Sequence, residues 1–337
     1  MPTVSIEEFL ALRAEGFPVV DARSEKEFAI GHIEGASNLP LLDDENRVIV
    51  GTAYKVSGRE IAVQKGFELA GPQFGEIFKK GRKLAHQKKI LVYCWRGGLR
   101  SNILAWVLSF TQAEIYVLEN GYKNYRKRVL ATLDFPYKFI VLGGKTGSGK
   151  TEVLHLLKEK GEQVLDIEAL ACHKGSSFGA LGMKPQPQQE HFENSIAEVL
   201  FKCDVGKRIW VENESRLTGR LVLPLEIFNA LRQRKLIELE VSTATRIARL
   251  ASEYAQFDTN LLEEALNRLQ KRLGGLRTKL ALEAVAEKNN EVWIQLVLEY
   301  YDSTYTFGLS NRTGKIEKLT WNWENKNDSL QQLIAHD

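Results

Sequence analysis

One stretch decides the fold of this chain's second half: Gly144-Lys145-Thr146-Gly147-Ser148-Gly149-Lys150-Thr151. It follows the apolar run 139–142, which is typical of a buried strand, and it precedes residues 153–158, whose apolar positions have helical spacing. A strand, a glycine-rich loop and a helix in this order distinguish a P-loop from a chance match to G-x-x-x-x-G-K-[ST]. The glycines let backbone N–H groups turn toward an anion, and the helix N-terminus adds positive potential. We therefore predict a phosphate-binding loop, and the motif by itself leaves open what the phosphates are attached to.

Each residue type in the loop has an expected role. Lys150 would reach the terminal phosphate oxygens, and the hydroxyl of Thr151 would hold a Mg²⁺ ion. Loops after strand ends line the ligand crevice of an open α/β sheet, so the polar stretch after the next apolar run, 163–165, is a second candidate for ligand contacts. The predicted cofactor-binding residues are Gly144, Gly147, Ser148, Gly149, Lys150 and Thr151 of the loop, with His173, Lys174 and Ser176 of the later stretch.

Two acidic residues at strand ends complete this predicted site. Asp166 ends the run 163–165, and Glu212 ends the run 208–211, where P-loop proteins usually place the Asp of the Walker-B strand. A carboxylate there would bind Mg²⁺ through water or position a nucleophile. We predict Asp166 and Glu212 as catalytic residues, and Thr151 with Glu212 as the metal site. The alternative, an acid that merely ends a strand, stays open.

Composition sets a few further limits. A chain of 337 residues can form two domains, each with its own core. The net charge is only +3, so nucleic-acid binding has to come from local patches. The cysteines Cys94, Cys172 and Cys203 are too scattered for a disulfide framework or a zinc site, which fits a reducing compartment. The start has no secretory pattern, and no apolar run approaches the roughly 18 residues of a membrane helix, so we expect a cytoplasmic protein.

A second candidate site lies in the first half of the chain. The apolar run 90–93 ends at Cys94-Trp95-Arg96-Gly97-Gly98-Leu99-Arg100-Ser101, and the apolar helical pattern 103–108 follows. A cysteine between a strand end and a helix start faces a cup of backbone N–H groups, and Arg96 and Arg100 add positive charge that favours the thiolate. We predict Cys94 as a nucleophile or sulfur carrier, with Arg96 and Arg100 as catalytic partners. A buried structural cysteine is the alternative.

Two earlier segments carry a recognisable pattern: residues 21–28 read D-A-R-S-x-x-E-F, and residues 31–40 read G-H-I-x-G-A-x-N-x-P. With the cysteine loop they resemble the rhodanese (sulfurtransferase) superfamily, over the part of the chain up to about residue 130. The resemblance implies a rhodanese-like α/β domain and a structural rather than catalytic His32. The residues agree, because a histidine in a glycine-flanked turn usually forms local hydrogen bonds.

The cysteine loop departs from the sulfurtransferase pattern in its length. Cys94 to Arg100 is C-x5-R, one residue longer than the active loop of sulfur-transferring rhodaneses, and cysteine phosphatases use this spacing to hold a tetrahedral phosphate. The longer loop suggests an anion larger than a terminal sulfur. A phosphatase is therefore a rival interpretation, weakened because Tyr93 stands where phosphatases have His.

Basic residues gather in three segments. They lie at 79–89, at 123–128, and in a predicted helix at 261–282 whose basic residues surround Gly274-Gly275. The last would serve as a lid over phosphates or as a track for an RNA backbone. The alternative for each is an ordinary solvated helix face.

A rhodanese-like domain joined to a P-loop domain is more specific than either motif alone. The chain resembles the tRNA 2-selenouridine synthase family over nearly its whole length, through Y-C-W-R-G-G-L-R-S at 93–101, G-G-x-T-G-S-G-K-T at 143–151, H-K-G-S-x-F-G at 173–179 and W-V-E-x-E-S-R at 210–216. This resemblance implies that selenium from selenophosphate replaces the sulfur of wobble 2-thiouridine in tRNA. It also implies an S-geranyl intermediate made from geranyl diphosphate, with Mg²⁺ as the expected cofactor.

The same resemblance implies a fold, a key residue and partners. The fold is a rhodanese-like α/β domain, 1–132, followed by a P-loop NTPase-like domain, 133–337, with a mainly parallel sheet and a basic helical C-terminal part. Selenation should need Cys94, whose pocket Gly66 would support. The partners would be tRNA, through its anticodon loop, and selenophosphate synthetase. The P-loop would hold a diphosphate, and no NTP hydrolysis would be required.

Three alternatives stay open at this point. They are a sulfurtransferase whose P-loop domain is regulatory, an ATP-dependent kinase or RNA-processing enzyme with a decayed rhodanese module, and a non-catalytic tRNA-binding adaptor. The intact cysteine loop and the intact Lys150-Thr151 pair argue against decay of either half.

Overall fold

The computed structural model describes residues 1–85 and 88–336, and the chain divides into two compact units. The first unit consists of residues 1–132 together with 188–198, and the second consists of 133–187 together with the chain from 199 onward. The segment 188–198, which we expected in the P-loop domain, thus belongs to the first unit. It is held there by side-chain hydrogen bonds, among them those from Arg126 to Asn194 (2.5 Å) and from Arg13 to Glu198 (2.6 Å).

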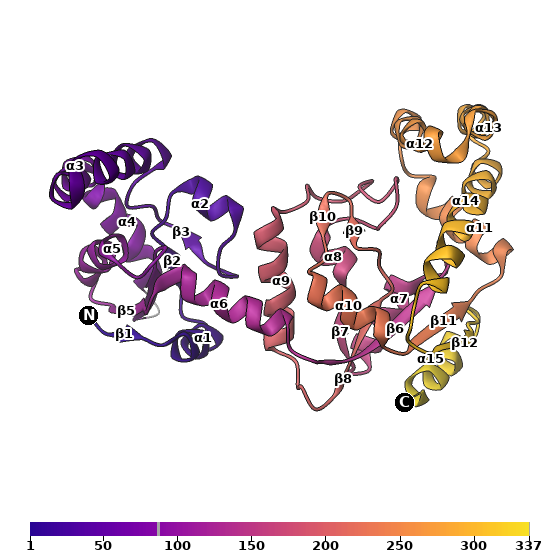
Figure 1. Ribbon diagram of the computed structural model, residues 1–337, viewed down its shortest axis with the longest axis horizontal. Helices are drawn as coiled ribbons and strands as arrows, with labels where there is room; N and C mark the ends of the chain where they lie inside the picture. Colours follow the sequence, from indigo (N-terminus) through magenta and orange to yellow (C-terminus); the bar gives the residue numbers. More distant parts are fainter. Residues whose placement is uncertain (86–87, 337) are drawn as a thin grey trace. The chain divides into compact units, whose positions relative to one another are not determined.

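A parallel sheet of five strands, in the order β1-β5-β4-β2-β3, forms the core of the first unit (Figure 1). The strands are β1 (Thr3–Val4), β2 (Val19–Asp21), β3 (Ser37–Asn38), β4 (Lys89–Tyr93) and β5 (Glu114–Leu118). The helical elements are α1 (Ile6–Ala14), α2 (Glu25–Ile30), α3 (Asp44–Ala70), the short η1 (Gly71–Gln73), α4 (Phe74–Leu84), α5 (Leu99–Ser109), α6 (Gly121–Leu133) and most of α9 (Gln189–Phe201). β4 lies in the middle of the sheet and is buried from Ile90 to Tyr93, as expected for a strand covered on both faces.

The second unit is built on another parallel sheet of five strands, in the order β12-β11-β6-β8-β7. Its strands are β6 (Lys138–Gly144), β7 (Gln163–Leu165), β8 (Arg208–Glu212), β11 (Leu236–Glu240) and β12 (Ile316–Thr320), and a separate antiparallel pair is formed by β9 (Leu217–Thr218) and β10 (Leu221–Val222). β6 is central, and Leu142 pairs with Glu212 of β8 while Gly144 pairs with Leu239 of β11. The ends of three strands therefore meet at the edge where the P-loop begins.

Helices cover this sheet, and some of them form a separate helical group beside it. They are α7 (Lys150–Glu159), α8 (Ile167–Ala171), α10 (Leu225–Gln233), α11 (Thr243–Tyr254), α12 (Thr259–Leu273), α13 (Gly275–Ala286), α14 (Asn290–Ser310) and α15 (Lys326–Ala335). In Figure 1, α11 to α14 stand together as a helical group, with a core that includes Phe178, Tyr254 and Trp293. α7 and α15 share a second core, in which Leu154 and Leu330 pack with Trp210 of β8.

The predicted fold class, α/β with parallel sheets in both halves, is confirmed. The helix predicted at 261–282 is two helices, because Gly274 has φ +89° and the chain reverses direction there. The region after residue 283, whose role the sequence did not indicate, supplies α14, an edge strand of the sheet and α15. In the described ranges, no helix combines the length and the apolar character needed to span a membrane.

Candidate functional site

The P-loop connects the end of β6 to the first residue of α7, Lys150. Gly147 (φ +81°) and Gly149 (φ +87°) have backbone angles that L side chains rarely adopt, which explains the residue type at both positions. Lys150 Nζ donates to the carbonyl oxygen of Gly144 at 3.0 Å and so spans the loop. The hydroxyl of Ser148 is buried and has no hydrogen-bond partner among the described residues. The loop has the form that a phosphate cradle requires.

A cleft of about 1500 Å³ opens in front of the loop. It brings together most of the predicted ligand-binding residues, namely Gly144, Gly147, Gly149, Lys150, Thr151, Lys174 and Ser176, and it also includes Asp166. Ser148, His173 and Glu212 are not among the residues that line it. The lining also includes an aromatic wall that the sequence did not reveal, formed by Phe228, Tyr254, Tyr301, Tyr305 and Phe307. The cleft therefore joins a phosphate site to an apolar surface.

Four acidic residues lie close together beside Thr151: Asp166, Glu168, Glu212 and Glu214. The Thr151 hydroxyl donates to Glu168 Oε2 at 3.2 Å, and the backbone N–H of Glu168 donates to Glu212 Oε1 at 2.7 Å. Burial, followed by the negative charges of Asp166 and Glu168, raises the pKa of Glu212 well above its ordinary value. Burial and the charge of Glu168 raise the pKa of Glu214 to about 8, and Lys150 acts in the opposite direction. Burial is the larger cause of both shifts, and the repulsion among the neighbouring carboxyl groups adds to it.

This cluster fits a hard cation such as Mg²⁺. A hydroxyl and a carboxylate facing one cleft are oxygen ligands of the kind that Mg²⁺ prefers, and Mg²⁺ completes its shell with water and substrate phosphates. In the described part of the chain no group of three or more His, Cys, Asp or Glu forms a protein-only metal site. Thr151 and Glu168 are the residues that would hold the ion. Glu212, which we also expected to hold the ion, is only 2% exposed; its Oε1 accepts from the Glu168 backbone, and its Oε2 has no partner among the described residues, so its role at the metal stays a prediction.

The other predicted residues of this half have local contacts. Asp166 caps α8 by accepting from the N–H of Ala169 at 2.9 Å, and its second oxygen pairs with His155 Nε2 at 3.3 Å. His173 is half-buried, its Nδ1 accepts from the N–H of Gly175 at 3.1 Å, and burial lowers its pKa. Lys174 forms an ion pair with Glu253. These contacts give Asp166 and His173 clear structural roles.

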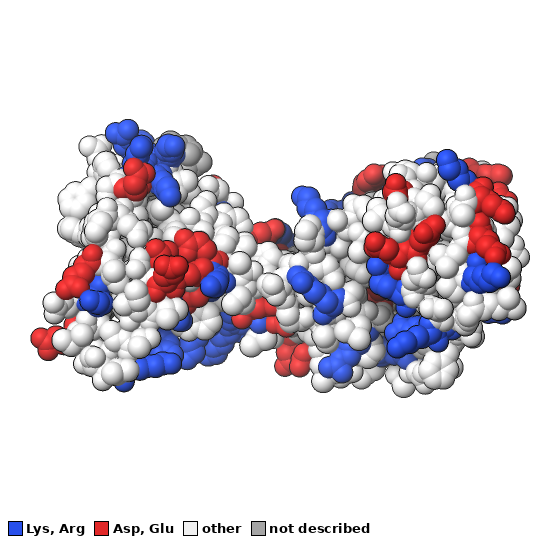
Figure 2. Space-filling model, turned by 90° about the horizontal axis from the view of Figure 1, so that it is seen from above, with Lys and Arg blue, Asp and Glu red and all other residues white. Residues whose placement is uncertain are grey.

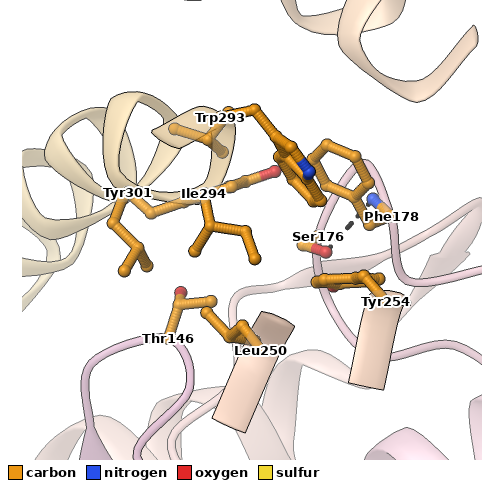
Figure 3. A pocket seen from close by; sticks show the side chains of 10 residues that line it. Thr146, Ser176, Phe178, Leu250, Tyr254, Trp293, Ile294 and Tyr301 are labelled. Carbon is orange, nitrogen blue, oxygen red and sulfur yellow. Dashed lines mark hydrogen bonds between the residues drawn. The ribbon is translucent and has the colours of Figure 1, made fainter. Parts of the chain in front are cut away.

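Ser176 borders a small apolar cavity beside the P-loop residue Thr146 (Figure 3). Its Oγ accepts from the N–H of Phe178 at 3.2 Å, and the ring of Phe178 stacks on Trp293 with 5.3 Å between centroids. The cavity measures about 10 Å³, which is room for about one water molecule. These contacts attach the loop that carries Ser176 to the helical group. The cavity itself is too small to bind an organic ligand.

Helix α14 holds the P-loop from the outside, which the sequence did not indicate. Tyr305 Oη accepts from the N–H of Gly144 at 2.7 Å. Asp302 pairs with Arg246 at 2.7 Å and with Lys145 at 3.3 Å, and Arg246 also donates to the carbonyl oxygen of Thr146 at 3.1 Å. The buried Arg246 thereby couples the loop to two helices. A pattern search misses such residues because they lie about 100 to 160 positions away in the chain.

The cysteine loop lies at the end of β4 in the first unit. Cys94 is only 3% exposed, and its thiol donates to Ser101 Oγ at 3.2 Å. Gly121, with φ +56°, presses against the loop from behind: a Cβ there would come 2.2 Å from the carbonyl oxygen of Cys94. The same oxygen accepts from the N–H of Tyr122 at 2.8 Å. The start of α6 therefore holds the backbone of Cys94 in place.

The two arginines of the loop have different surroundings. Arg96 is exposed. Arg100 donates to Glu27 at 2.5 Å, and Arg47 lies 3.6 Å from the same carboxylate. Burial raises the pKa of Glu27, the hydrogen bond from Arg100 lowers it, and the net shift is downward. We expected both arginines to support the Cys94 thiolate, but the charge of Arg100 is already engaged by a carboxylate.

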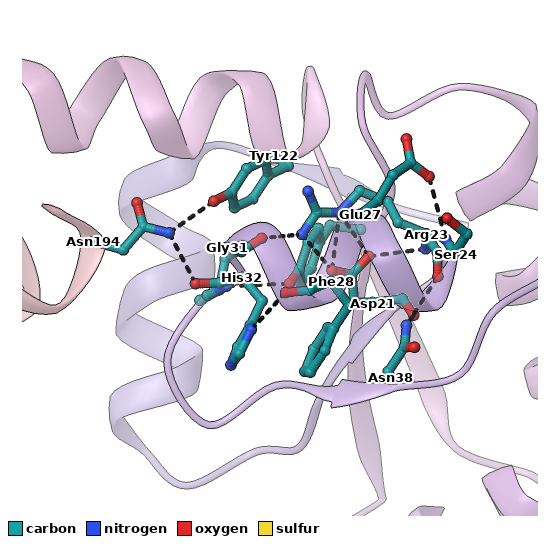
Figure 4. A network of polar contacts seen from close by, with 12 residues as sticks. Asp21, Arg23, Ser24, Glu27, Phe28, Gly31, His32, Asn38, Tyr122 and Asn194 are labelled. Atoms are coloured by element: carbon teal, nitrogen blue, oxygen red, sulfur yellow. Dashed lines mark hydrogen bonds and ion pairs between the residues drawn. The ribbon is translucent and has the colours of Figure 1, made fainter. Parts of the chain in front are cut away.

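The residues of the earlier pattern form a buried network (Figure 4). Asp21 and Arg23 are both fully buried and pair at 2.7 Å, and Arg23 also donates to the carbonyl oxygen of Gly31 at 2.6 Å. The ring of His32 stacks on Phe28 with 3.8 Å between centroids, and its Nδ1 lies 2.9 Å from the carbonyl oxygen of the same residue. These contacts fit a structural His32. The pattern at 21–40 therefore ties β2 to the turn after α2.

Gly66 and two of the basic segments have local contacts, whereas the segment 123–128 adjoins the cysteine loop through a hydrogen bond from the N–H of Lys123 to the carbonyl oxygen of Trp95 at 3.0 Å. A side chain at Gly66 in α3 would first meet Val50, 4.0 Å away. Three basic residues of α12 and α13 are paired with acids: Arg268 with Glu264, Arg277 with Glu299 and Lys279 with Glu283. On the face seen in Figure 2, basic and acidic groups are interspersed and form no continuous stripe. The RNA track therefore stays a prediction.

Comparisons with known proteins agree with both halves. Residues 5–128 match the rhodanese-like domain, and residues 137–335 match the tRNA 2-selenouridine synthase AAA domain. A tRNA 2-selenouridine synthase of Nitrosomonas europaea is 33% identical and covers 92% of this chain and 94% of its own length. Those of Sulfurovum sp. and Pseudomonas fluorescens are 34% and 36% identical, and the alignments cover 92% and 89% of this chain and 93% and 90% of the relatives. Similarity of this extent, through both the rhodanese-like and the P-loop domain, makes the chain a member of the tRNA 2-selenouridine synthase family.

Proposed function

We propose that this protein is an enzyme that converts wobble 2-thiouridine of tRNA to 2-selenouridine, with selenophosphate as the selenium donor and an S-geranyl nucleoside as the intermediate. The observation that carries the proposal is the cleft of the second unit. It combines a phosphate cradle with an aromatic wall, and an allylic diphosphate has both a doubly charged head and an apolar chain. The names of the relatives support the tRNA substrate and the selenium product.

In the first step the sulfur of thiouridine attacks C1 of geranyl diphosphate. A carbon–sulfur bond forms, the carbon–oxygen bond breaks, and diphosphate leaves with the electron pair while the ring nitrogen loses its proton. Lys150 and the N–H groups of the P-loop would stabilise the charge that grows on the leaving diphosphate. Mg²⁺, held by Thr151 and Glu168, would add a Lewis acid there. Glu214 lines the cleft, and in its carboxylate form it would accept the proton.

In the second step selenium replaces the alkylated sulfur. The selenium of selenophosphate attacks C2 of the pyrimidine, the carbon–sulfur bond breaks, and geranylthiol leaves with a proton. Water then cleaves the phosphorus–selenium bond and releases phosphate. We assign Cys94 and its loop to this step, with Arg96 as the exposed cation nearest to the thiol in the chain. The buried thiol would have to leave its hydrogen bond to Ser101 in order to give its proton to the leaving geranylthiolate, and it would regain a proton from the water that cleaves the phosphorus–selenium bond.

The test is nucleoside mass analysis of thiolated tRNA incubated with protein and Mg²⁺. Geranyl diphosphate alone should give an S-geranyl adduct, and added selenophosphate should give the selenium nucleoside. Cys94→Ala should abolish selenation and keep geranylation, whereas Lys150→Ala should reduce geranylation roughly 100-fold. Cys203→Ala is the matched control, because that half-buried thiol donates to the carbonyl oxygen of Val199 within its own helix.

Two results would contradict the proposal. A folded Cys94→Ala variant that has lost both activities would show that the two steps are not divided between the two loops. ATP turnover coupled to the modification would show that the P-loop holds a nucleotide in the reaction. Unchanged nucleosides with turnover of thiosulfate would favour a sulfurtransferase, and unchanged nucleosides with tight tRNA binding would favour an adaptor.

A further inference from the structure

The ring of Trp323 lies against the end of the P-loop. Trp323 belongs to the segment between β12 and α15, more than 170 residues after the loop that it touches. A Cβ placed on Gly149 would come 2.2 Å from Cζ2 of Trp323 and 2.9 Å from its Cη2. The indole therefore packs directly on the glycine backbone. Its N–H is buried and has no partner among the described residues, so contacts of the ring faces and edges hold it in place.

A guanidinium covers a face of this indole. The Cζ atom of Arg249, in α11, lies 3.8 Å from the ring centroid of Trp323, and the same side chain pairs with Glu152 at 2.7 Å. Glu152 is in the first turn of α7, and Gly149, Glu152 and Arg249 all line the cleft. Trp323 and Arg249 thus form a closed stack beside the N-terminus of the helix that carries Lys150.

This stack lies beside the side of the P-loop on which a nucleoside would leave, and Arg249 is its member that lines the cleft. In a P-loop, the Lys reaches the β- and γ-phosphates, and the α-phosphate lies on the side of the helix N-terminus. A base attached there would need a flat partner, and a guanidinium is a common one. Here the guanidinium of Arg249 already stacks on Trp323. A nucleobase would have to displace the indole from Gly149, whereas the aromatic wall formed by Tyr301, Tyr305 and Phe307 stays open to an apolar chain.

We infer that Trp323 is a specificity-determining residue that excludes nucleotides, so that the P-loop accepts diphosphates whose substituent is not a nucleoside. The inference rests on the proposed function in one respect only, namely that the P-loop binds a diphosphate. It explains how a loop with every residue of a nucleotide-binding motif can serve a different class of diphosphate. The discrimination comes from shape, because the indole fills the slot without offering a hydrogen bond to a base.

The experiment is isothermal titration calorimetry of the full chain in Mg²⁺ with three probes: inorganic diphosphate, geranyl diphosphate and ADP. Wild type should bind ADP about 100-fold more weakly than inorganic diphosphate. Trp323→Ala should reduce this ratio to about tenfold or less and should leave the affinity for inorganic diphosphate within about threefold. Trp323→Leu, which keeps apolar bulk against Trp321 but has no flat ring, should show part of the gain and guards against misfolding of the alanine variant. Trp106→Ala, at an exposed tryptophan of the first unit, is the control and should change nothing.

The inference and the proposed function fail on different results. Equal affinity of wild type for ADP and inorganic diphosphate, or an unchanged ratio in both folded Trp323 variants, would overturn the role of Trp323. So would a lack of any diphosphate binding. Geranyl diphosphate that binds no better than inorganic diphosphate would contradict the proposed substrate, and the ADP ratio would still support Trp323 as the residue that excludes nucleotides.

Discussion

Protonation of His191 should destabilise the first unit at mildly acidic pH. Its ring, in α9, lies 4.2 Å from the ring of His32, which in turn stacks on Phe28. Burial, with a smaller contribution from His32, lowers the pKa of His191 to about 4, and Glu34 acts in the opposite direction. An unfolded histidine titrates near pH 6.5, so between pH 6.5 and about 4 the unfolded state binds more protons than the folded state. The free energy of unfolding must therefore fall as the pH falls through this window.

The size of the loss follows from the two pKa values. Lowering the pKa from 6.5 to about 4 corresponds to a loss of at most about 3 kcal/mol in the free energy of unfolding at low pH. Solvent screens a half-buried ring, so we expect roughly 2 kcal/mol, which is about a 30-fold change in an opening equilibrium. Hydrogen exchange of the 188–198 peptide, corrected for the intrinsic rate at each pH, measures this equilibrium directly.

The variant for this test is His191→Phe, which keeps a ring against His32 and removes the proton. Its peptide should lose about 30-fold less protection than the wild-type peptide between pH 7 and pH 4. His155→Phe, at an exposed histidine of the second unit, serves as the control. Equal losses of protection in wild type and His191→Phe would refute the reasoning, because protonation of this residue would then not oppose the docking of α9.

Two further predictions concern the loops themselves. Glu168→Gln should raise the Mg²⁺ concentration needed for half-maximal binding of inorganic diphosphate about tenfold or more, measured by calorimetry, while Glu159→Gln at the end of α7 should not; equal curves for the two variants would remove Glu168 from the cation site. Gly121→Ala should destabilise the first unit by about 2 to 4 kcal/mol and alter the rate at which a thiol probe labels Cys94, because the new Cβ would meet the Cys94 carbonyl oxygen at 2.2 Å. Gly16→Ala, with φ +94° but open space around it, should cost about 1 kcal/mol or less, and similar melting curves for both alanine variants would contradict the close contact.

The parts of the site that the sequence predicts are those encoded by neighbours in the chain. The P-loop, the cysteine loop and the parallel sheets follow from apolar runs and glycine spacing within about ten residues. Glu168, Tyr305 and Trp323 could not be found in this way, because each reaches the P-loop from a different segment of the fold. The sequence offered Glu212 as the acid beside Thr151, and only the fold shows that Glu168 stands between them.

The cysteine loop illustrates how a contact can decide between two interpretations of one spacing. C-x5-R is the spacing of a phosphatase loop, in which the final arginine must be available to hold the phosphate. Here Arg100 is engaged by Glu27, the acid of the D-A-R-S-x-x-E-F pattern, and Glu27 also accepts from the backbone N–H of Ser24 at 3.2 Å.

An incoming anion would have to compete with a partly buried carboxylate that two arginines surround. Separating such an ion pair costs free energy, because the partly buried carboxylate would be left without its main partner. The loop therefore retains the exposed Arg96 and the backbone N–H groups as its readily available donors. This arrangement disfavours the phosphatase interpretation of the C-x5-R spacing, because the arginine that would hold the phosphate is already paired.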